Sequence, residues 1–208
     1  MSSVPKILLT SQEYLSRERK AAFKSEFYRG EMFAMAGASW EHTSVKDNIA
    51  RHAGNQLDDG PCRVLTSDLR VKVDATGLYT YPDIVIVSDE PLFEDNMFDT
   101  LLNPLALMEV LSDSTERYDR GTKAGHYRRI PSLKEYILIA QDEPLVERYV
   151  RQPDDSWLLT EFRGLTQTLT LASAPATIKL ADIYRGVVFA GECEPVARSL
   201  TNIPTVNK

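Results

Sequence analysis

The sequence lacks any run of apolar residues that approaches the length of about 18 to 20 needed to cross a membrane. Its first six residues, Met-Ser-Ser-Val-Pro-Lys, also lack the charged and then apolar pattern of a signal peptide. We therefore expect a cytoplasmic protein that makes no membrane contact.

Cysteine and histidine are scarce. The two cysteines, Cys62 and Cys193, are far apart, which in a reducing compartment predicts buried thiols and no disulfide. None of the three histidines has a second histidine at ligand spacing, so a histidine-rich metal site is not expected. His42, near a predicted helix start, is interpreted as a capping or surface residue, and His52 and His126 as surface residues.

Two common catalytic motifs are also missing. The chain has no Gly-x-x-x-x-Gly-Lys-Ser/Thr segment, which argues against an NTPase. Ser112 and Ser114 lack a Gly-x-Ser-x-Gly setting, which argues against a serine hydrolase.

The composition is that of an ordinary globular protein, with 43% apolar and 26% charged residues among 208. A net charge of −6 weighs against a surface that grips nucleic acid everywhere. The negative charge does not exclude a nuclease, because clustered site carboxylates lower the net charge. The six basic side chains within residues 117–129 are interpreted as a solvated helix face.

Hydrophobic periodicity and turn residues predict one domain over residues 1–208, with a core at about 10–190 and a frayed, flexible tail at 195–208. The fold class is α/β or mixed α+β around a central sheet. Expected helices are 10–20, 39–57, 122–130 and 180–189; expected strands are 62–73, 78–87, 105–111 and 136–140, with hairpins at 27–36 and 145–162.

Two carboxylates interrupt apolar, β-branched strand patterns. Asp83 follows Pro82 and precedes Ile-Val-Ile-Val, and Glu109 lies within Leu-Met-Glu-Val-Leu. A carboxylate at the edge of a buried strand costs several kcal/mol unless it is paired. If the strands are neighbours, the pair could bind Mg²⁺, which accepts one or two carboxylates and keeps waters for a substrate phosphate. Lys123, on a predicted helix face shared with Asp119 and Tyr127, would add a cation.

Each of these residues alone has a commoner structural explanation. An aspartate after proline is usually a turn residue, a strand glutamate is usually in an ion pair, and a lone lysine is usually solvated. The acid–acid–lysine order on strand, strand and helix favours the functional interpretation.

These segments resemble the PD-(D/E)XK nuclease superfamily and, more closely, its Uma-two family of restriction endonuclease-like proteins. The resemblance is strongest at residues 109–116, 118–123 and 130–136, is supported by Gly30-Glu31, Glu41-His42 and Ser67-Asp68, and spans roughly residues 10–190. It implies a restriction-endonuclease-like core, a central mixed sheet flanked by helices, which is often dimeric.

One position departs from the superfamily pattern. The second motif usually ends in lysine, but the chain has Leu111 there, and the Uma-two pattern implies that Lys123 replaces it. The resemblance also implies Glu31 as a further carboxylate, for which a surface role is equally compatible with the sequence. Tyr127 either orients Lys123 or belongs to the core.

The leading hypothesis is a Mg²⁺-dependent endonuclease, with Mn²⁺ as a substitute, that cuts DNA as a homodimer. Asp83 and Glu109 would bind the metal, and Lys123 would position or help deprotonate the attacking water. The alternative is a nuclease-fold binding or assembly module without useful activity, which the acidic charge balance and Leu111 favour.

Overall fold

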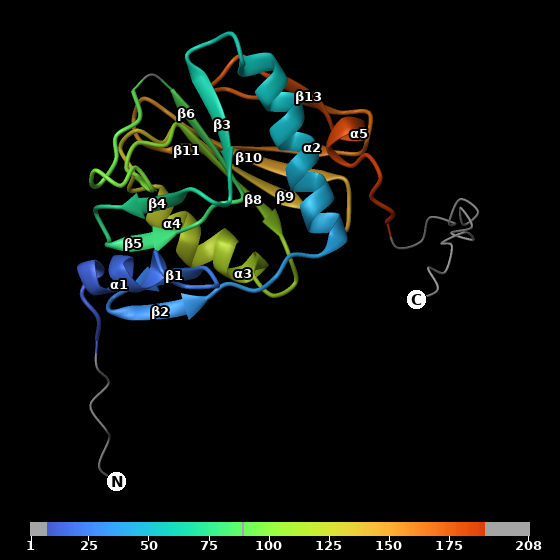
Figure 1. Ribbon diagram of the computed structural model, residues 1–208. Coiled ribbons are helices and arrows are strands. Elements are labelled where there is room, and N and C mark those ends of the chain that lie inside the picture. Colours follow the sequence, from blue (N-terminus) through green and yellow to red (C-terminus); the bar gives the residue numbers. More distant parts are fainter. Residues whose placement is uncertain (1–7, 89, 190–208) are drawn as a thin grey trace, which may run out of the picture.

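A computed structural model describes residues 8–88 and 90–189 (Figure 1). The predicted tail at 195–208 and Cys193 lie outside the described residues. The elements along the chain are α1 (Ser11–Glu18), β1 (Ser25–Tyr28), β2 (Glu31–Ala34), α2 (Trp40–Leu57), β3 (Cys62–Thr66), β4 (Arg70–Val73), β5 (Leu78–Thr80), β6 (Ile84–Ser88), β7 (Thr100–Leu101), β8 (Ala106–Leu111), α3 (Glu116–Tyr118), the π-helix η1 (Asp119–Lys123), α4 (Ala124–Tyr127), β9 (Glu135–Ala140), β10 (Leu145–Arg151), β11 (Trp157–Arg163), β12 (Thr168–Thr170), β13 (Thr177–Lys179) and α5 (Leu180–Ile183).

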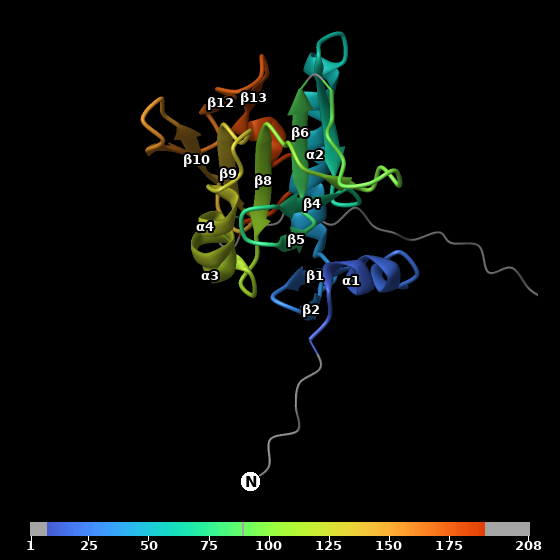
Figure 2. The ribbon, with the colours of Figure 1, turned by 90° about the vertical axis from the view of Figure 1, so that its left-hand side faces the viewer.

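The largest sheet has the strand order β11-β10-β9-β8-β6-β3. Strands β8 and β9 are parallel and their neighbours are antiparallel, so the predicted mixed central sheet is confirmed. Helix α2 and the α3–η1–α4 segment lie on opposite sides of this sheet (Figures 1 and 2). A sheet covered on both faces explains why its central strands are almost continuously apolar.

Strand β6 illustrates how the sequence builds this sheet. Ile84 and Ile86 belong to the core on the α2 face, and Val85 and Val87 belong to the core on the α4 face. The alternation follows from the pleat, in which successive side chains point to opposite faces. On the adjacent β8, Glu109 therefore points to the α4 face.

A second sheet, β2-β1-β5-β4-β7, lies beside the α4 side of the molecule. Its first hairpin turns at Arg29 and Gly30, whose φ angles of 49° and 85° suit the turn that matches strand twist. A Cβ at Gly30 would lie 2.7 Å from the Cβ of Leu8, so this position requires glycine. The predicted hairpin, with Glu31 opening its second strand, is confirmed.

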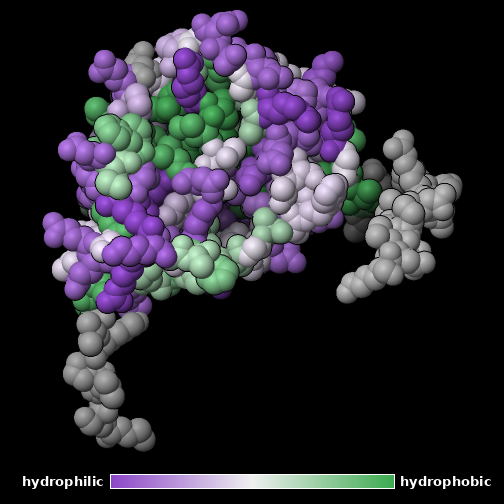
Figure 3. Space-filling model, in the orientation of Figure 1, coloured by the Kyte–Doolittle hydropathy of each residue, from purple (hydrophilic) through white to green (hydrophobic). Residues whose placement is uncertain are grey.

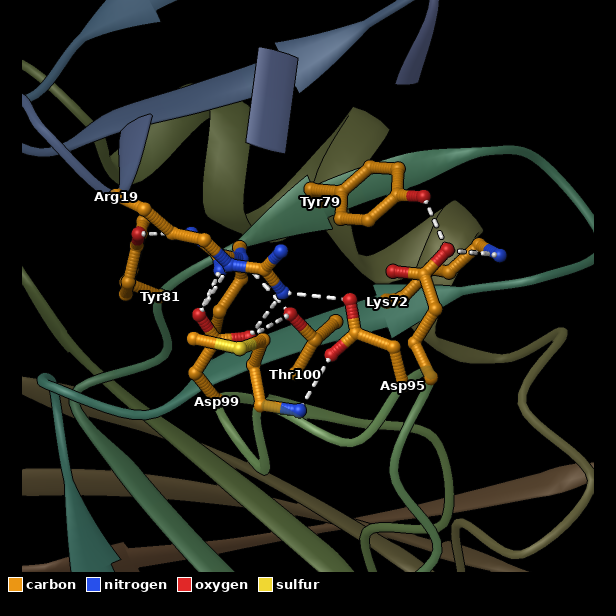
Figure 4. Close-up of polar contacts among 10 residues, drawn as sticks. Arg19, Lys72, Tyr79, Tyr81, Asp95, Asp99 and Thr100 are labelled. Atoms are coloured by element: carbon orange, nitrogen blue, oxygen red, sulfur yellow. Dashed lines mark hydrogen bonds and ion pairs between the residues drawn. The ribbon is translucent and has the colours of Figure 1, made fainter. Parts of the chain in front are cut away.

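Polar contacts attach α1 to this second sheet (Figure 4). Arg19, directly after α1, donates hydrogen bonds to Asp95 and Asp99. Arg70 on β4 is 3% exposed and donates to Tyr81 while it pairs with Asp99. These contacts fix the amino-terminal helix and hairpin against the strands that lead into β6.

The predicted strands 62–73 and 78–87 were too long. A turn at 67–69 divides the first, and an irregular segment at 81–83 divides the second and sets Asp83 immediately before β6. The helix expected at 180–189 is shorter, and only α5 forms there. The helix expected at 122–130 begins earlier, at Glu116. Within the described ranges, no helix is both long and apolar enough to cross a membrane.

Candidate active site

Asp83 and Glu109 lie side by side at one end of neighbouring strands. Strands β6 and β8 are antiparallel, with Ile84 opposite Met108. Asp83, directly before Ile84, is therefore brought opposite Glu109, directly after Met108. The Asp83 amide approaches Glu109 Oε2 at 3.4 Å, and the Val110 amide donates to Asp83 Oδ2 at 2.9 Å. The pairing of neighbouring strands that the sequence analysis required for these two residues to meet is therefore present.

Lys123 reaches the same place from the helical segment on the α4 face. Its Nζ lies 2.9 Å from Glu109 Oε1 and 3.5 Å from Asp119 Oδ1. The predicted face shared with Asp119 and Tyr127 is confirmed, but the backbone there is the π-helix η1. A π-helix is rare and frequently marks a functional site.

The hairpin contributes a carboxylate that the sequence analysis missed. Glu26 on β1 lies 3.2 Å from Lys123 Nζ, and it accepts hydrogen bonds from Thr80 at 2.5 Å and Tyr118 at 3.1 Å. Glu31, the hairpin carboxylate that the resemblance implies, is opposite Tyr28 in the register. Because residues 26 and 28 share a face, Glu31 lies on the same side of the hairpin as Glu26.

Tyr127 contacts Glu109 directly. Its hydroxyl donates to Glu109 Oε1 at 2.7 Å, and the side chain is fully buried. Burial and the neighbouring Glu109 carboxylate raise the pKa of Tyr127 well above its usual value. The phenol therefore stays protonated and remains a donor at neutral pH.

The electrostatics of the site are dominated by burial. Burial raises the pKa of Glu109 to about 8; Asp119 and Asp83 also raise it, while Lys123 lowers it. Burial raises the pKa of Asp119 as well. For Lys123, burial opposes the charge, but Glu109 and the other nearby acidic groups outweigh it and raise its pKa well above the usual value. Lys123 is thus held as a cation.

The sequence analysis interpreted His42 as a capping or surface residue and gave it no part in the site. His42 lies in the first turn of α2, and its Nε2 is 3.1 Å from Asp83 Oδ2. Its buried Nδ1 has no hydrogen-bond partner among the described residues. The surface expectation was wrong for His126, which is 8% exposed and packs edge-on against Tyr28.

The donor set suits a metal that needs few protein ligands. Across residues 8–88 and 90–189, no group of three or more His, Cys, Asp or Glu side chains is arranged to hold a metal ion. Asp83 and Glu109 are two adjacent carboxylates, and the Asp83 side chain is 15% exposed. Such a pair fits Mg²⁺, which binds through one or two carboxylates and completes its shell with waters and phosphate.

Comparison with known proteins places the chain in a family. The Uma2 family model, described as "Putative restriction endonuclease", matches residues 11–181. The chain belongs to the Uma2 family. Two Synechocystis proteins described as uncharacterized are similar to it. The protein sll1609 is 41% identical over 76% of this chain and 89% of its own length, and slr1290 is 33% identical over 90% and 97%.

A solved structure is similar in fold to this Uma2 chain. It is the crystal structure of an Anabaena variabilis protein titled "a putative nuclease belonging to DUF820", with a TM-score of 0.67 and 15% identity. The similarity covers 83% of this chain and 96% of that one. At this identity the likeness concerns the fold alone, and it confirms the expected nuclease-like α+β architecture.

The departure from the nuclease superfamily pattern now has a structural description in this Uma2 chain. Leu111 is buried in the apolar core on the same sheet face as Glu109. The space beside Glu109 is taken by the Lys123 ammonium. The lysine beside the second acidic residue, Glu109, therefore comes from a helix and not from strand β8.

Proposed function

We propose that this protein is a divalent-metal-dependent endonuclease that hydrolyses phosphodiester bonds of DNA. The observation that carries the proposal is the contact between Glu109 and Lys123. Glu109 lies beside Asp83 where two adjacent strands of a nuclease-like sheet meet. Family membership supports the same reaction class.

Asp83 and Glu109 are the residues that would hold the metal, with Mg²⁺ as the expected ion and Mn²⁺ as a substitute. A bound divalent cation supplies charge neutralisation at the phosphate and makes a water more acidic. Both carboxylates are oriented by backbone amides, Asp83 by Val110 and Glu109 by Asp83 itself. This orientation reduces the rearrangement needed for binding.

Lys123 is proposed to act as a fixed cation. Its pKa is raised, so it retains its proton at neutral pH and cannot accept one from the attacking water. The ammonium instead can donate hydrogen bonds to the water or the scissile phosphate and stabilise charge that develops in the transition state. The buried hydrogen bond from Tyr127 to Glu109 fixes the carboxylate that contacts Lys123.

His42 is proposed as a positioning residue for Asp83. Its Nε2 can donate to the Oδ2 atom that also accepts the Val110 amide, which leaves the other Asp83 oxygen to bind a ligand. His42→Gln keeps a donor of similar reach, so it should retain more activity than His42→Ala. An equal loss in both variants would contradict a positioning role.

Plasmid, branched and single-stranded DNA would be incubated with Mg²⁺ or Mn²⁺, comparing the unaltered protein with Asp83→Ala. Asp59→Ala is the matched control, because Asp59 is an exposed aspartate beyond the far end of α2. We expect metal-dependent cutting that is lost in Asp83→Ala and kept in Asp59→Ala. If no substrate is cut, or if Asp83→Ala cuts as well as the control, the proposal fails.

A second candidate is a binding or assembly module that keeps the nuclease fold without useful activity. It is favoured by the enclosure of Lys123, whose side chain is 6% exposed and already neutralised by carboxylates. Calorimetric titration with Mn²⁺ separates the two: a binding site that Glu109→Ala removes supports the enzyme, and no binding supports the module.

We further propose that the working form is a homodimer, as the family resemblance implies. Light scattering during size-exclusion chromatography should give about twice the monomer mass of 23.4 kDa. A monomer mass at micromolar concentration would contradict it.

A further inference from the structure

One edge of the six-stranded sheet is open. The sheet ends at β11, which is seven residues long and, within the described residues, pairs with β10 alone. In Figure 2 the labelled strands β6, β8, β9 and β10 follow one another from the middle of the molecule toward its left-hand side, and β11 comes next in the strand order. Leu158 and Leu159 point to opposite faces of β11 and are 57% and 43% exposed. The edge is therefore accessible from both faces of the sheet.

The outer side of β11 presents a row of peptide groups. The Gly164 amide donates to the opposite carbonyl of Pro144, and the Gln152 amide donates to Ser156 at the other end of the hairpin. Both bonds require that even-numbered residues of β11 bond to β10, while odd-numbered residues turn their N–H and C=O groups outward. Across residues 8–88 and 90–189, none of these outward groups has a hydrogen-bond partner. They belong to Trp157, Leu159, Glu161 and Arg163.

Nothing in the sequence of β11 protects this edge. Edge strands that stay unpaired are commonly blunted by lysine, proline, a bulge or great shortness. The strand reads Trp-Leu-Leu-Thr-Glu-Phe-Arg, with no lysine or proline, and its register with β10 runs unbroken over all seven residues. Its two charges neutralise each other, since Arg163 Nε lies 3.2 Å from Glu161 Oε2. The strand thus has the features of one that accepts a further strand.

The opposite edge of the same sheet is different. Strand β3 has five residues, and its Cys62 and Thr66 carbonyl groups already accept hydrogen bonds. The donors are the Arg63 guanidinium and the Leu69 amide. Figure 3 shows this side of the molecule, where hydrophilic residues border the hydrophobic area over β3 and β6. Of the two edges, β11 is the one that offers a continuous ladder.

We propose that β11 pairs with β11 of a second copy of this chain, antiparallel and about a two-fold axis at Thr160, so that the two sheets join into one. An antiparallel edge is complementary to itself, because the outward N–H and C=O groups of one copy meet those of the other. In this register all seven residues are paired and no like charges are opposite. The pairs are Thr160 with Thr160, Leu159 with Glu161, Leu158 with Phe162 and Trp157 with Arg163 of the partner subunit.

The side chains favour the axis at Thr160 over its neighbours. Leu158 then meets an aromatic side chain and the two threonines meet each other, and cross-strand pairs of both kinds are stabilising. An axis at Glu161 would set two glutamates directly opposite, which is destabilising. An axis at Leu159 would set Phe162 and Arg163 opposite residues 156 and 155, which lie outside the strand.

This inference rests on the homodimer given under the proposed function and names its interface. Opposite residues of an antiparallel pair project to the same face of the sheet, so the two-fold axis is perpendicular to the joined sheet. The α4 faces of both copies consequently lie on the same side. Both Glu109–Lys123 contacts would then be presented on one side of the dimer.

Light scattering during size-exclusion chromatography, without metal or DNA, tests the interface. We expect about twice the monomer mass of 23.4 kDa for the unaltered protein and the monomer mass for Leu159→Pro at the same concentration. The Leu159 N–H points outward, so proline there removes no bond to β10 and is tolerated in an edge strand. Leu159→Lys should also give a monomer, because lysine blunts an edge.

Leu92→Lys is the matched control, because Leu92 is an exposed leucine outside β11, and it should remain a dimer. An unchanged circular dichroism spectrum establishes that each variant is folded. A monomeric unaltered protein would overturn both the homodimer and this interface. A dimer that persists in both Leu159 variants would overturn the interface alone, and neither result bears on metal-dependent cleavage.

An engineered disulfide tests the register. In a Cys193→Ser background, in which the remaining Cys62 is buried, Thr160→Cys should crosslink two copies under oxidised glutathione. Opposite residues of a non-hydrogen-bonded pair have Cα atoms about 4.5 Å apart, which a disulfide can span. Leu158→Cys is the control: its two copies would lie about 14 Å apart along the strands and should stay reduced. Equal crosslinking of both variants, or none of Thr160→Cys, would overturn the axis at Thr160.

Discussion

Replacing Lys123 by methionine tests whether the lysine balances buried carboxylates. The Nζ atom lies 2.9 Å from Glu109, 3.2 Å from Glu26 and 3.5 Å from Asp119, and methionine has a similar length without the charge. Removing one partner of a buried ion pair typically costs about 3–5 kcal/mol. For a chain of this size the melting temperature should fall by roughly 6–20 °C, at about 2–4 °C per kcal/mol.

The loss should depend on pH in a defined direction. Glu109 and Asp119 already have raised pKa values, and loss of the Lys123 charge raises them further. The folded variant then binds more protons than the unfolded chain above a pH of about 4, so its stability falls as pH rises. The deficit relative to the unaltered protein should be larger at pH 8 than at pH 5.

Urea denaturation at the two pH values measures this directly. The double variant Lys123→Met with Glu109→Gln should recover part of the loss at pH 8, because one uncompensated carboxylate is gone. Lys134→Met, at an exposed lysine, is the control and should stay within about 0.5 kcal/mol. A loss below about 1 kcal/mol, or an equal loss at both pH values, would refute the buried arrangement of Lys123.

Three further outcomes follow from single contacts. Tyr127→Phe should lower the free energy of unfolding by about 1.5–3 kcal/mol in urea titrations, because a donor to a buried carboxylate is lost. Arg70→Met should lower the free energy of unfolding by about 1–3 kcal/mol, because the buried Arg70 no longer donates to Thr100 and Tyr81, while Asp99 keeps Arg19 as a partner. Arg19 holds the pKa of Asp99 below its usual value, so the stability Asp99 provides is present at neutral pH and lost in acid. Asp99→Asn should therefore melt below the unaltered protein at pH 7, and the difference should shrink as pH falls toward 3.

The strand carboxylates could be predicted because their signal is local. Glu109 interrupts an apolar strand and Asp83 directly precedes one, and neighbouring strands bring such residues together. Glu26 and His42 carry no such signal. Their roles depend on how the β1–β2 hairpin and the start of α2 dock beside the main sheet, which is a property of tertiary packing.

The fold followed the same division. The long amphipathic helix α2 and the hairpin turn at Arg29-Gly30 were predicted, since periodicity and turn residues specify them locally. Strands β7, β12 and β13 were not expected, because two or three residues are too few to establish an alternating pattern. The π-helix that carries Lys123 also has no distinct sequence pattern, although it decides where the ammonium lies.

The central claim is that Asp83 and Glu109 form a divalent metal site. Its most direct test is a crystal structure of the protein soaked with Mn²⁺, with the anomalous signal used to locate the ion. We predict one anomalous peak within about 2.0–2.6 Å of an oxygen of each carboxylate, near the Lys123 ammonium, and its loss in Glu109→Ala crystals. A well-ordered site with no peak, or a peak that persists in the variant, would contradict the account.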